Sequence, residues 1–163
     1  WNMEEEKKCS ISHPSLYPSV AILDGNLTLT LPLDISITTV MDALSHSFEA
    51  IWNKNRNQHS TELAIEAICL ILENVGELKK NRRNLESRRN LLLAANLAGR
   101  AISKTKTAAA HSISYPLTLR YGIPHGVACS LPLLPLIELN ERNVESTCTL
   151  FKTARSNLFS LRT

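Results

Sequence analysis

Three long segments of this sequence carry apolar residues at the spacing of an α-helix. They are residues 38–52, 60–75 and 85–102. In the second and third, apolar side chains cover much of the helix circumference, which is typical of helices buried among other helices. Only 5 of the 163 residues are glycine, which disfavours sandwiches and barrels because those folds need many turns. We therefore expect an all-α fold, a multi-helix bundle of about five or six helices.

The first part of the chain does not follow this helical pattern. Three prolines interrupt residues 1–36, so this part is expected to be an irregular lead-in or interdomain segment. Within it, residues 19–23 are apolar enough to form one short strand. Residues 37–163 are expected to form the helical domain.

Residues near the helix ends give further expectations. Thr38 or Thr39 is a candidate N-cap for the first helix, because a hydroxyl group can accept a hydrogen bond from a first-turn amide. Gly76 and the basic residues after it are expected to end or kink the second helix. Pro116 is expected to interrupt the chain beyond the third helix, and a last amphipathic helix is expected over residues 143–159.

Charge and cysteine content indicate which partners and which cellular location to expect for this protein. The 18 basic and 15 acidic residues give a net charge of +3, and the densest basic run, residues 79–83, contains no aromatic residue. We interpret that run as a solvated helix end rather than a phosphate-binding surface, and expect no nucleic-acid partner. Cys69 and Cys129 lie in apolar runs and are expected to be buried. The four cysteines form no CxxC pair and no apolar run reaches the ~18 residues of a membrane span, so we expect a cytoplasmic protein without a membrane partner.

The segment 41–46 holds the first candidate for chemistry. Asp42 and His46 are four residues apart, so on a helix they project from one face, one turn apart. This arrangement offers a carboxylate oxygen and an imidazole nitrogen to one metal ion. The same spacing also suits a hydrogen-bonded Asp–His pair on a solvated face, and the pair alone leaves both interpretations open.

Two further histidines, His111 and His125, lie inside apolar segments. A buried imidazole needs a partner for its ring nitrogens, and either a metal ion or a hydrogen bond in the core can provide one. Together with Asp42 and His46 they form a set of nitrogen and oxygen donors that suits Fe(II) or Zn(II) better than Mg(II). The residues by themselves do not decide between a metal site and two core histidines whose ring nitrogens are satisfied by hydrogen bonds.

Three motifs in this sequence resemble, in the same order, those of one known family. Residues 33–50 contain Met-Asp-Ala-Leu-Ser-His and look like the GMDALTHAIEA stretch of iron-containing alcohol dehydrogenases. Residues 94–99 resemble the family's AxxLAG helix, and residues 110–128 resemble its second signature, HxxxHxLG followed by PHGxAN. Ordered motifs over such a length are more specific than any one of them.

The resemblance implies the C-terminal helical metal-binding domain of such an enzyme, with a dehydroquinate synthase-like helical fold. In that family an Asp, a His one turn later and the two outer histidines of the second signature bind the metal. By position these are Asp42, His46, His111 and His125. The implied activity is hydride transfer between NAD or NADP and a small-molecule alcohol or aldehyde, with Fe(II) or Zn(II) polarising the substrate oxygen. A homodimer is also implied.

The sequence departs from the family pattern at two places. The middle histidine of HxxxH is Tyr115 here, and we expect its phenol to hydrogen-bond the substrate oxygen or the cofactor. Before His111 the family is rich in Asn, whereas this chain has Lys104 and Lys106, which together with Arg120 can bind a substrate phosphonate. This pattern is similar to the phosphonoacetaldehyde reductase branch. The alternative is that both lysines only solvate a helix end.

No glycine-rich phosphate loop occurs among the 5 glycines of the sequence. In the resembling family the nucleotide binds mainly to an N-terminal α/β domain, so this chain is expected to be an incomplete part of the enzyme with unknown cofactor-binding residues. A glycerol-dehydrogenase-like or dehydroquinate-synthase-like metalloenzyme and an inactive helical interaction domain are the alternative interpretations.

Overall fold

The structure is a computed structural model that describes residues 11 and 13–141 of the chain. This part forms six α-helices and two short 3-10 helices, and it contains no β-strand. The elements in chain order are η1 (Pro14–Leu16), η2 (Gly25–Thr28), α1 (Leu33–Trp52), α2 (Gln58–Lys80), α3 (Leu85–Thr105), α4 (Ala109–Tyr121), α5 (His125–Ser130) and α6 (Leu133–Glu141). The all-α prediction is therefore confirmed. None of the helices in the described range is long and apolar enough to cross a membrane.

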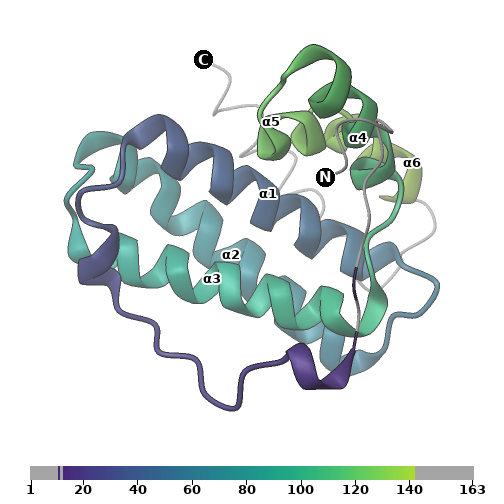
Figure 1. Cartoon of the computed structure of the whole chain (residues 1–163), viewed down its shortest axis with the longest axis horizontal. Helices are drawn as coiled ribbons and strands as arrows, with labels where there is room; N and C mark the ends of the chain where they lie inside the picture. The colour runs from purple at the N-terminus through teal and green to yellow at the C-terminus, as the bar shows by residue number, and fades with distance from the viewer. Residues whose placement is uncertain (1–10, 12, 142–163) are drawn as a thin grey trace.

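The three long helices α1, α2 and α3 pack side by side and enclose the main core (Figure 1). Phe48 and Ile51 of α1, Ile68 of α2 and Leu97 of α3 are almost fully buried in this core. The short helices α4, α5 and α6 gather near α1 at one end of the bundle (Figure 1). Helix α1 thus lies between the bundle core and the short helices, which places one of its faces toward each.

Helix α1 begins at Leu33, earlier than the predicted caps Thr38 and Thr39. Pro32 occupies the N-cap position, and its carbonyl accepts a hydrogen bond from the Ser36 amide at 3.0 Å. The hydroxyl groups of Thr38 and Thr39 bond instead to carbonyls within the helix. The cap prediction was wrong because proline is well suited to the start of a helix, where it loses no hydrogen bond.

A buried arginine holds the start of α1 against α3. The Arg88 side chain is 3% exposed, and its guanidinium donates to the Ser36 hydroxyl at 2.6 Å and to the Leu31 carbonyl at 3.0 Å. It also donates to the Arg82 carbonyl at 2.8 Å. This one side chain therefore joins the chain before α1, the first turn of α1, and the loop before α3.

Helix α2 continues through Gly76 and ends at Lys80, so the predicted end at the basic residues is confirmed. The predicted break at Pro116 does not occur, because Pro116 lies inside α4. A turn follows α4, in which Gly122 adopts the left-handed conformation (φ 66°) and its amide donates to the Thr118 carbonyl.

Two other predictions concern the ends of the chain. Residues 19–23 form no strand and are largely exposed. The helix expected over residues 143–159 lies outside the described residues.

Helix α5 approaches α1 very closely at Gly126. A Cβ atom at this position would lie 1.9 Å from the backbone oxygen of Thr38. Only glycine permits this approach, because any side chain would overlap the backbone of α1. The contact fixes the first turn of α5, and with it His125, beside the polar face of α1.

Candidate metal centre

The four predicted ligands come from three helices and meet in one place. Asp42 and His46 lie on α1, His111 lies in the first turn of α4, and His125 is the first residue of α5. Oδ1 of Asp42 is 3.3 Å from Nε2 of His111. The same oxygen is 3.8 Å from Nε2 of His46 and 3.8 Å from Nε2 of His125. Asp42 is therefore the centre of the group.

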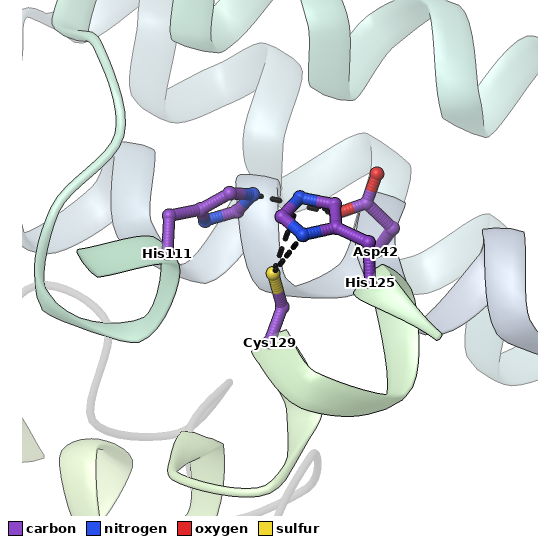
Figure 2. Close-up of side chains that lie close together, drawn as sticks. All are labelled: Asp42, His111, His125 and Cys129. Carbon is purple, nitrogen blue, oxygen red and sulfur yellow. Dashed lines mark hydrogen bonds and ion pairs between the residues drawn. The ribbon is translucent and has the colours of Figure 1, made fainter. Parts of the chain in front are cut away.

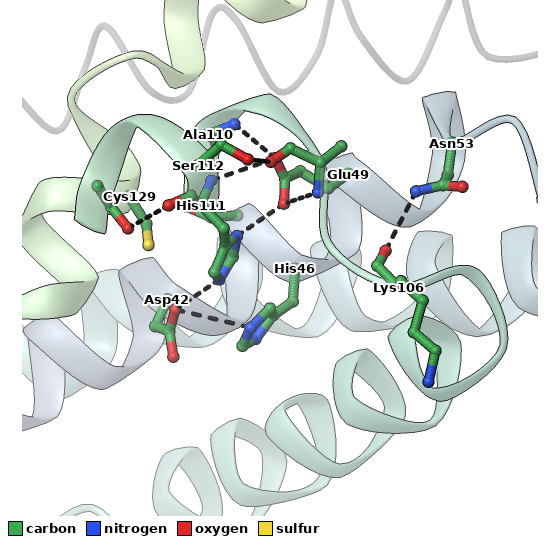
Figure 3. Close-up of polar contacts among 12 residues, drawn as sticks. Asp42, His46, Glu49, Asn53, Lys106, Ala110, His111, Ser112 and Cys129 are labelled. Atoms are coloured by element: carbon green, nitrogen blue, oxygen red, sulfur yellow. Dashed lines mark hydrogen bonds and ion pairs between the residues drawn. The ribbon is translucent and has the colours of Figure 1, made fainter. Parts of the chain in front are cut away.

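The imidazole rings pack closely around this carboxylate. The rings of His46 and His111 are stacked, with centroids 4.4 Å apart and planes at 14°. The His125 ring lies edge-on to His111, with centroids 5.4 Å apart. Figure 3 shows the rings of His46 and His111 both directed toward Asp42. The ligand atoms of Asp42, His111 and His125 thus lie within 4.8 Å of one another, and His46 adjoins them through its contact with Asp42 and its stacking on His111.

A fifth donor, which the sequence reasoning did not include, lies in the same group. The ligand atoms of Asp42, His111, His125 and Cys129 are all within 4.8 Å of one another. Figure 2 shows the Cys129 sulfur below the His125 ring, on the side that faces His111. Cys129 was predicted only to be buried. Its position one helical turn after His125 is the sequence signal that would have pointed to it.

Two buried atoms test whether these residues suit a metal ion. Oδ1 of Asp42 and Nε2 of His111 are inaccessible to solvent, and neither has a hydrogen-bond partner in the described part of the chain. Leaving such atoms buried without a partner is costly. A divalent cation bound between them would satisfy both, and the nitrogen and oxygen donors suit iron or zinc. The residues therefore fit the ion.

Glu49 is a second functional residue that the sequence reasoning missed. Its side chain is fully buried, and Oε2 lies 2.7 Å from Nδ1 of His111. Its two oxygens also accept hydrogen bonds from the backbone amides of Ala108 at 2.8 Å and Ala110 at 2.6 Å (Figure 3). Glu49 thus caps the start of α4, where Ala108 offers no side-chain cap. Its spacing of three residues after His46 placed it on the same face of α1.

The two stacked histidines differ in protonation. Burial lowers the pKa of His46 to about 4, against the opposing effect of Asp42. Burial also acts to lower the pKa of His111, but its contacts with Asp42, Cys129 and Glu49 outweigh burial and raise that pKa to about 11. Burial likewise disfavours ionisation of Asp42 and Glu49, yet their contacts with His111 keep both carboxyl pKa values below the ordinary value. Without metal, His111 is a cation between two carboxylates.

The three predicted residues that are not metal ligands lie at different places. The Tyr115 ring stacks on His125, with centroids 6.4 Å apart and planes at 10°, so it borders the ligand group. Lys104 is exposed in the last turn of α3. Lys106 follows α3 with a positive φ of 70°, and its ammonium lies apart from Asp42 in Figure 3. The structure brings Tyr115 to the ligand group, and it does not bring Lys106 there.

The bundle and its cluster of histidines define a helical domain with the donors for one divalent metal ion. The chain belongs to the Fe-containing alcohol dehydrogenase family, because its residues 36–157 match the C-terminal part of that family. The family predicted from the three sequence motifs is therefore confirmed.

Several relatives share this part of their chains with the protein. Phosphonoacetaldehyde reductase of Streptomyces viridochromogenes is 32% identical over 148 residues, which are 91% of this chain and 38% of that protein. The 1,3-propanediol dehydrogenase of Citrobacter freundii is 38% identical over 118 residues, which are 72% of this chain and 30% of that protein. The chain thus spans well under half the length of these relatives.

Solved structures show the same arrangement of helices. Sulfoacetaldehyde reductase from Bifidobacterium kashiwanohense, solved in complex with NAD+, matches with a TM-score of 0.80 and 29% identity over 93% of this chain and 44% of that chain. The archaeal alcohol dehydrogenase ADH/D1 from a Red Sea brine pool matches with a TM-score of 0.85 at 22% identity, over 98% of this chain and 45% of that chain. The second likeness concerns the fold alone.

Proposed function

We propose that this chain is the metal-binding domain of an NAD(P)-dependent alcohol dehydrogenase or aldehyde reductase. Asp42, His46, His111 and His125 hold one Fe(II) or Zn(II) in this proposal. The observation that carries it is the pair of buried atoms at the centre of the histidine group, Oδ1 of Asp42 and Nε2 of His111, which face each other at 3.3 Å without a hydrogen bond. Membership of the Fe-containing alcohol dehydrogenase family supports the same assignment.

Each residue of the centre has its own part in this function. A divalent ion supplies Lewis-acid polarisation of a substrate oxygen when it is bound. Glu49 holds Nδ1 of His111, so Nε2 of that ring faces Asp42. Tyr115 stacks beside the His125 ring, and its phenol can donate a hydrogen bond to a substrate oxygen or to the cofactor. A nicotinamide cofactor, NAD or NADP, would supply the hydride chemistry and would bind mainly to a domain outside this chain.

The substrate class in this proposal is a short aldehyde that carries an anionic group, such as a phosphonate. Support comes from the names of two relatives, a phosphonoacetaldehyde reductase and a sulfoacetaldehyde reductase, both of which indicate an anionic aldehyde. Lys104 and Lys106 are the candidate partners of that anion. The ammonium of Lys106 lies apart from Asp42 (Figure 3), and Lys104 is exposed in the last turn of α3.

The proposal also covers the oligomeric state, the location and the partners of the protein. We expect a cytoplasmic homodimer that acts on a small molecule and binds neither nucleic acid nor membrane. The absence of a described helix able to cross a membrane is compatible with this expectation. Light scattering coupled to size-exclusion chromatography measures the oligomeric state directly.

Metal analysis tests the centre itself. The purified protein, reconstituted with Zn(II) or with Fe(II) under anaerobic conditions, should hold about one equivalent of metal. His46→Ala should weaken metal binding by roughly tenfold or more, because it removes one donor. His59→Ala is the matched control, since His59 is exposed on α2. A protein that takes up no metal on reconstitution would contradict the proposal, and equal affinities for the two variants would contradict the assignment of His46.

The substrate class is tested separately, in a form of the enzyme that includes its nucleotide-binding domain. Lys104→Ala should raise KM for phosphonoacetaldehyde selectively, because it removes a charge that pairs with the phosphonate. KM for an uncharged aldehyde of similar size should change little. Lys106→Ala provides the comparison at the neighbouring lysine. An equal rise in KM for charged and uncharged aldehydes would indicate that Lys104 has a structural role instead.

A further inference from the structure

The buried thiol of Cys129 lies against the metal-binding face of the ligand group. The side chain is completely buried in α5, and Sγ is 3.5 Å from Nε2 of His125. Its ligand atom lies within 4.8 Å of those of Asp42, His111 and His125. Figure 2 shows the sulfur directed toward the space between the two rings. A thiol at this distance is close enough to share an ion with its neighbours.

The sequence departs from the family signature at Cys129. The family signature that residues 124–129 resemble reads PHGxAN, with an Asn at its last position. Here that position is Cys129, in the sequence Pro-His-Gly-Val-Ala-Cys. The substitution places a soft sulfur donor next to nitrogen and oxygen donors, and this changes which ions the group prefers.

A second observation points to a cation at this place independently of the thiol. Nε2 of His111, a side chain that is 1% exposed, is buried without a hydrogen-bond partner among the described residues. It is directed toward Oδ1 of Asp42, which likewise lacks a hydrogen-bond partner among those residues. The sulfur therefore borders a point where two buried atoms face each other at 3.3 Å without a hydrogen bond, and a cation there would bind both.

We propose that Cys129 binds the metal as a thiolate and joins Asp42 and the histidines in the ligand set. This inference rests on the metal centre of the proposed function. When the sulfur–metal bond forms, the S–H bond breaks and its proton leaves to solvent. The thiolate favours Zn(II) and Co(II) over harder ions such as Mn(II), because sulfur is the softest donor in the group.

Cobalt provides a direct probe, because thiolate ligation to Co(II) produces a charge-transfer absorption in the near ultraviolet. Titration of the metal-free protein with Co(II) should produce this band, which saturates at about one equivalent. Cys129→Ser should abolish the band and weaken Zn(II) binding by roughly tenfold or more, with a smaller effect on Mn(II). Cys69→Ser is the matched control, since Cys69 lies on α2, outside the ligand group.

A second variant covers the case in which Cys129→Ser does not fold. In the triple substitution of Cys9, Cys69 and Cys148 to serine, Cys129 is the one remaining thiol, since the sequence has 4 cysteines. The band should persist in this variant. Binding of one Co(II) without the band would overturn the thiolate assignment and leave the metal centre intact. Failure to bind Co(II) at all would overturn both proposals.

Discussion

At the scale of single residues, Glu49 sets the orientation of the His111 ring in the candidate metal centre. Its carboxylate holds Nδ1 of His111 at 2.7 Å, so the free nitrogen of the ring is Nε2, and this nitrogen faces Asp42. A hydrogen bond at one ring nitrogen fixes both the tautomer and the orientation of a metal-binding histidine. Glu49 is therefore a positioning residue, which acts through His111.

Glu49→Gln tests this role. The amide keeps the shape of the carboxylate, but its NH2 group cannot accept hydrogen bonds from Nδ1–H of His111 and the Ala108 amide, as Oε2 does now. The His111 ring then loses its fixed orientation, and we expect metal affinity to fall by roughly 10- to 100-fold. Competition with a chelator of known affinity measures the change.

The control for this experiment is Glu66→Gln, because Glu66 is exposed on α2. It should leave metal affinity unchanged. A Glu49→Gln protein that is less stable, but binds metal as tightly as the unaltered protein, would show that Glu49 only caps α4.

At the scale of elements, the sequence predicted the long helices better than their ends. The predicted start of the third helix at residue 85 agrees with the start of α3 at Leu85, where the Asn84 side chain accepts a hydrogen bond from the Ser87 amide. The start of α1 was missed, since Pro32 and the Arg88 contacts set it and no apolar pattern marks it. Pro116 is accommodated in α4, which local sequence rules did not predict.

In the candidate metal centre, too, some residues were predictable from the sequence and others depend on tertiary packing. Asp42 and His46 were predictable together because one helical turn separates them. The roles of Glu49 and Cys129 depend on how α4 and α5 pack against α1, which is a tertiary arrangement that spacing along the chain does not report. Both residues do lie one turn from a predicted ligand, and this was their one local signal.

The close contact between α5 and α1 gives a prediction at the scale of elements. Gly126→Ala places a methyl group 1.9 Å from the Thr38 backbone oxygen, so α5 must move away from α1. We expect a loss of roughly 1–3 kcal/mol in the free energy of unfolding, as for other overpacked sites. We also expect weaker metal binding, because His125 moves with α5. Denaturant titration and metal competition measure the two effects.

Gly99→Ala is the matched control for this substitution. Gly99 lies on the exposed side of α3, and a Cβ atom there would meet nothing within 4 Å. This variant should be more stable by about 0.5–1 kcal/mol, because alanine favours a helix over glycine. If Gly126→Ala were as stable as the unaltered protein and bound metal equally well, the close contact would not be what places His125.

At the scale of the whole molecule, the metal centre joins the long-helix bundle to the short helices. Its proposed ligands come from α1, α4 and α5, so one bound ion would connect segments that are far apart in sequence. A ligand that binds only the folded protein stabilises it in proportion to the logarithm of its affinity. Metal binding should therefore raise the melting temperature of the domain as a unit.

This stabilisation should increase with pH, and the two histidine pKa values give the sign. The pKa of His111 is raised to about 11 without metal, so Nε2 carries a proton at neutral pH that the ion must displace. The pKa of His46 is lowered to about 4, so His46 is neutral above pH 5 and contributes no pH dependence there. Between pH 6 and 8, the proton released by His111 should therefore strengthen Zn(II) binding about tenfold per pH unit, or about 1.4 kcal/mol. The thiol proton that Cys129 releases in the proposed ligand set adds to this slope, so the measurement is made in the Cys129→Ser variant. Melting curves with Zn(II) and with a chelator, recorded at each pH, isolate this increment from the pH dependence of the metal-free protein. An increment that stayed constant from pH 6 to 8 would show that His111 does not lose a proton on binding, and would remove it from the ligand set.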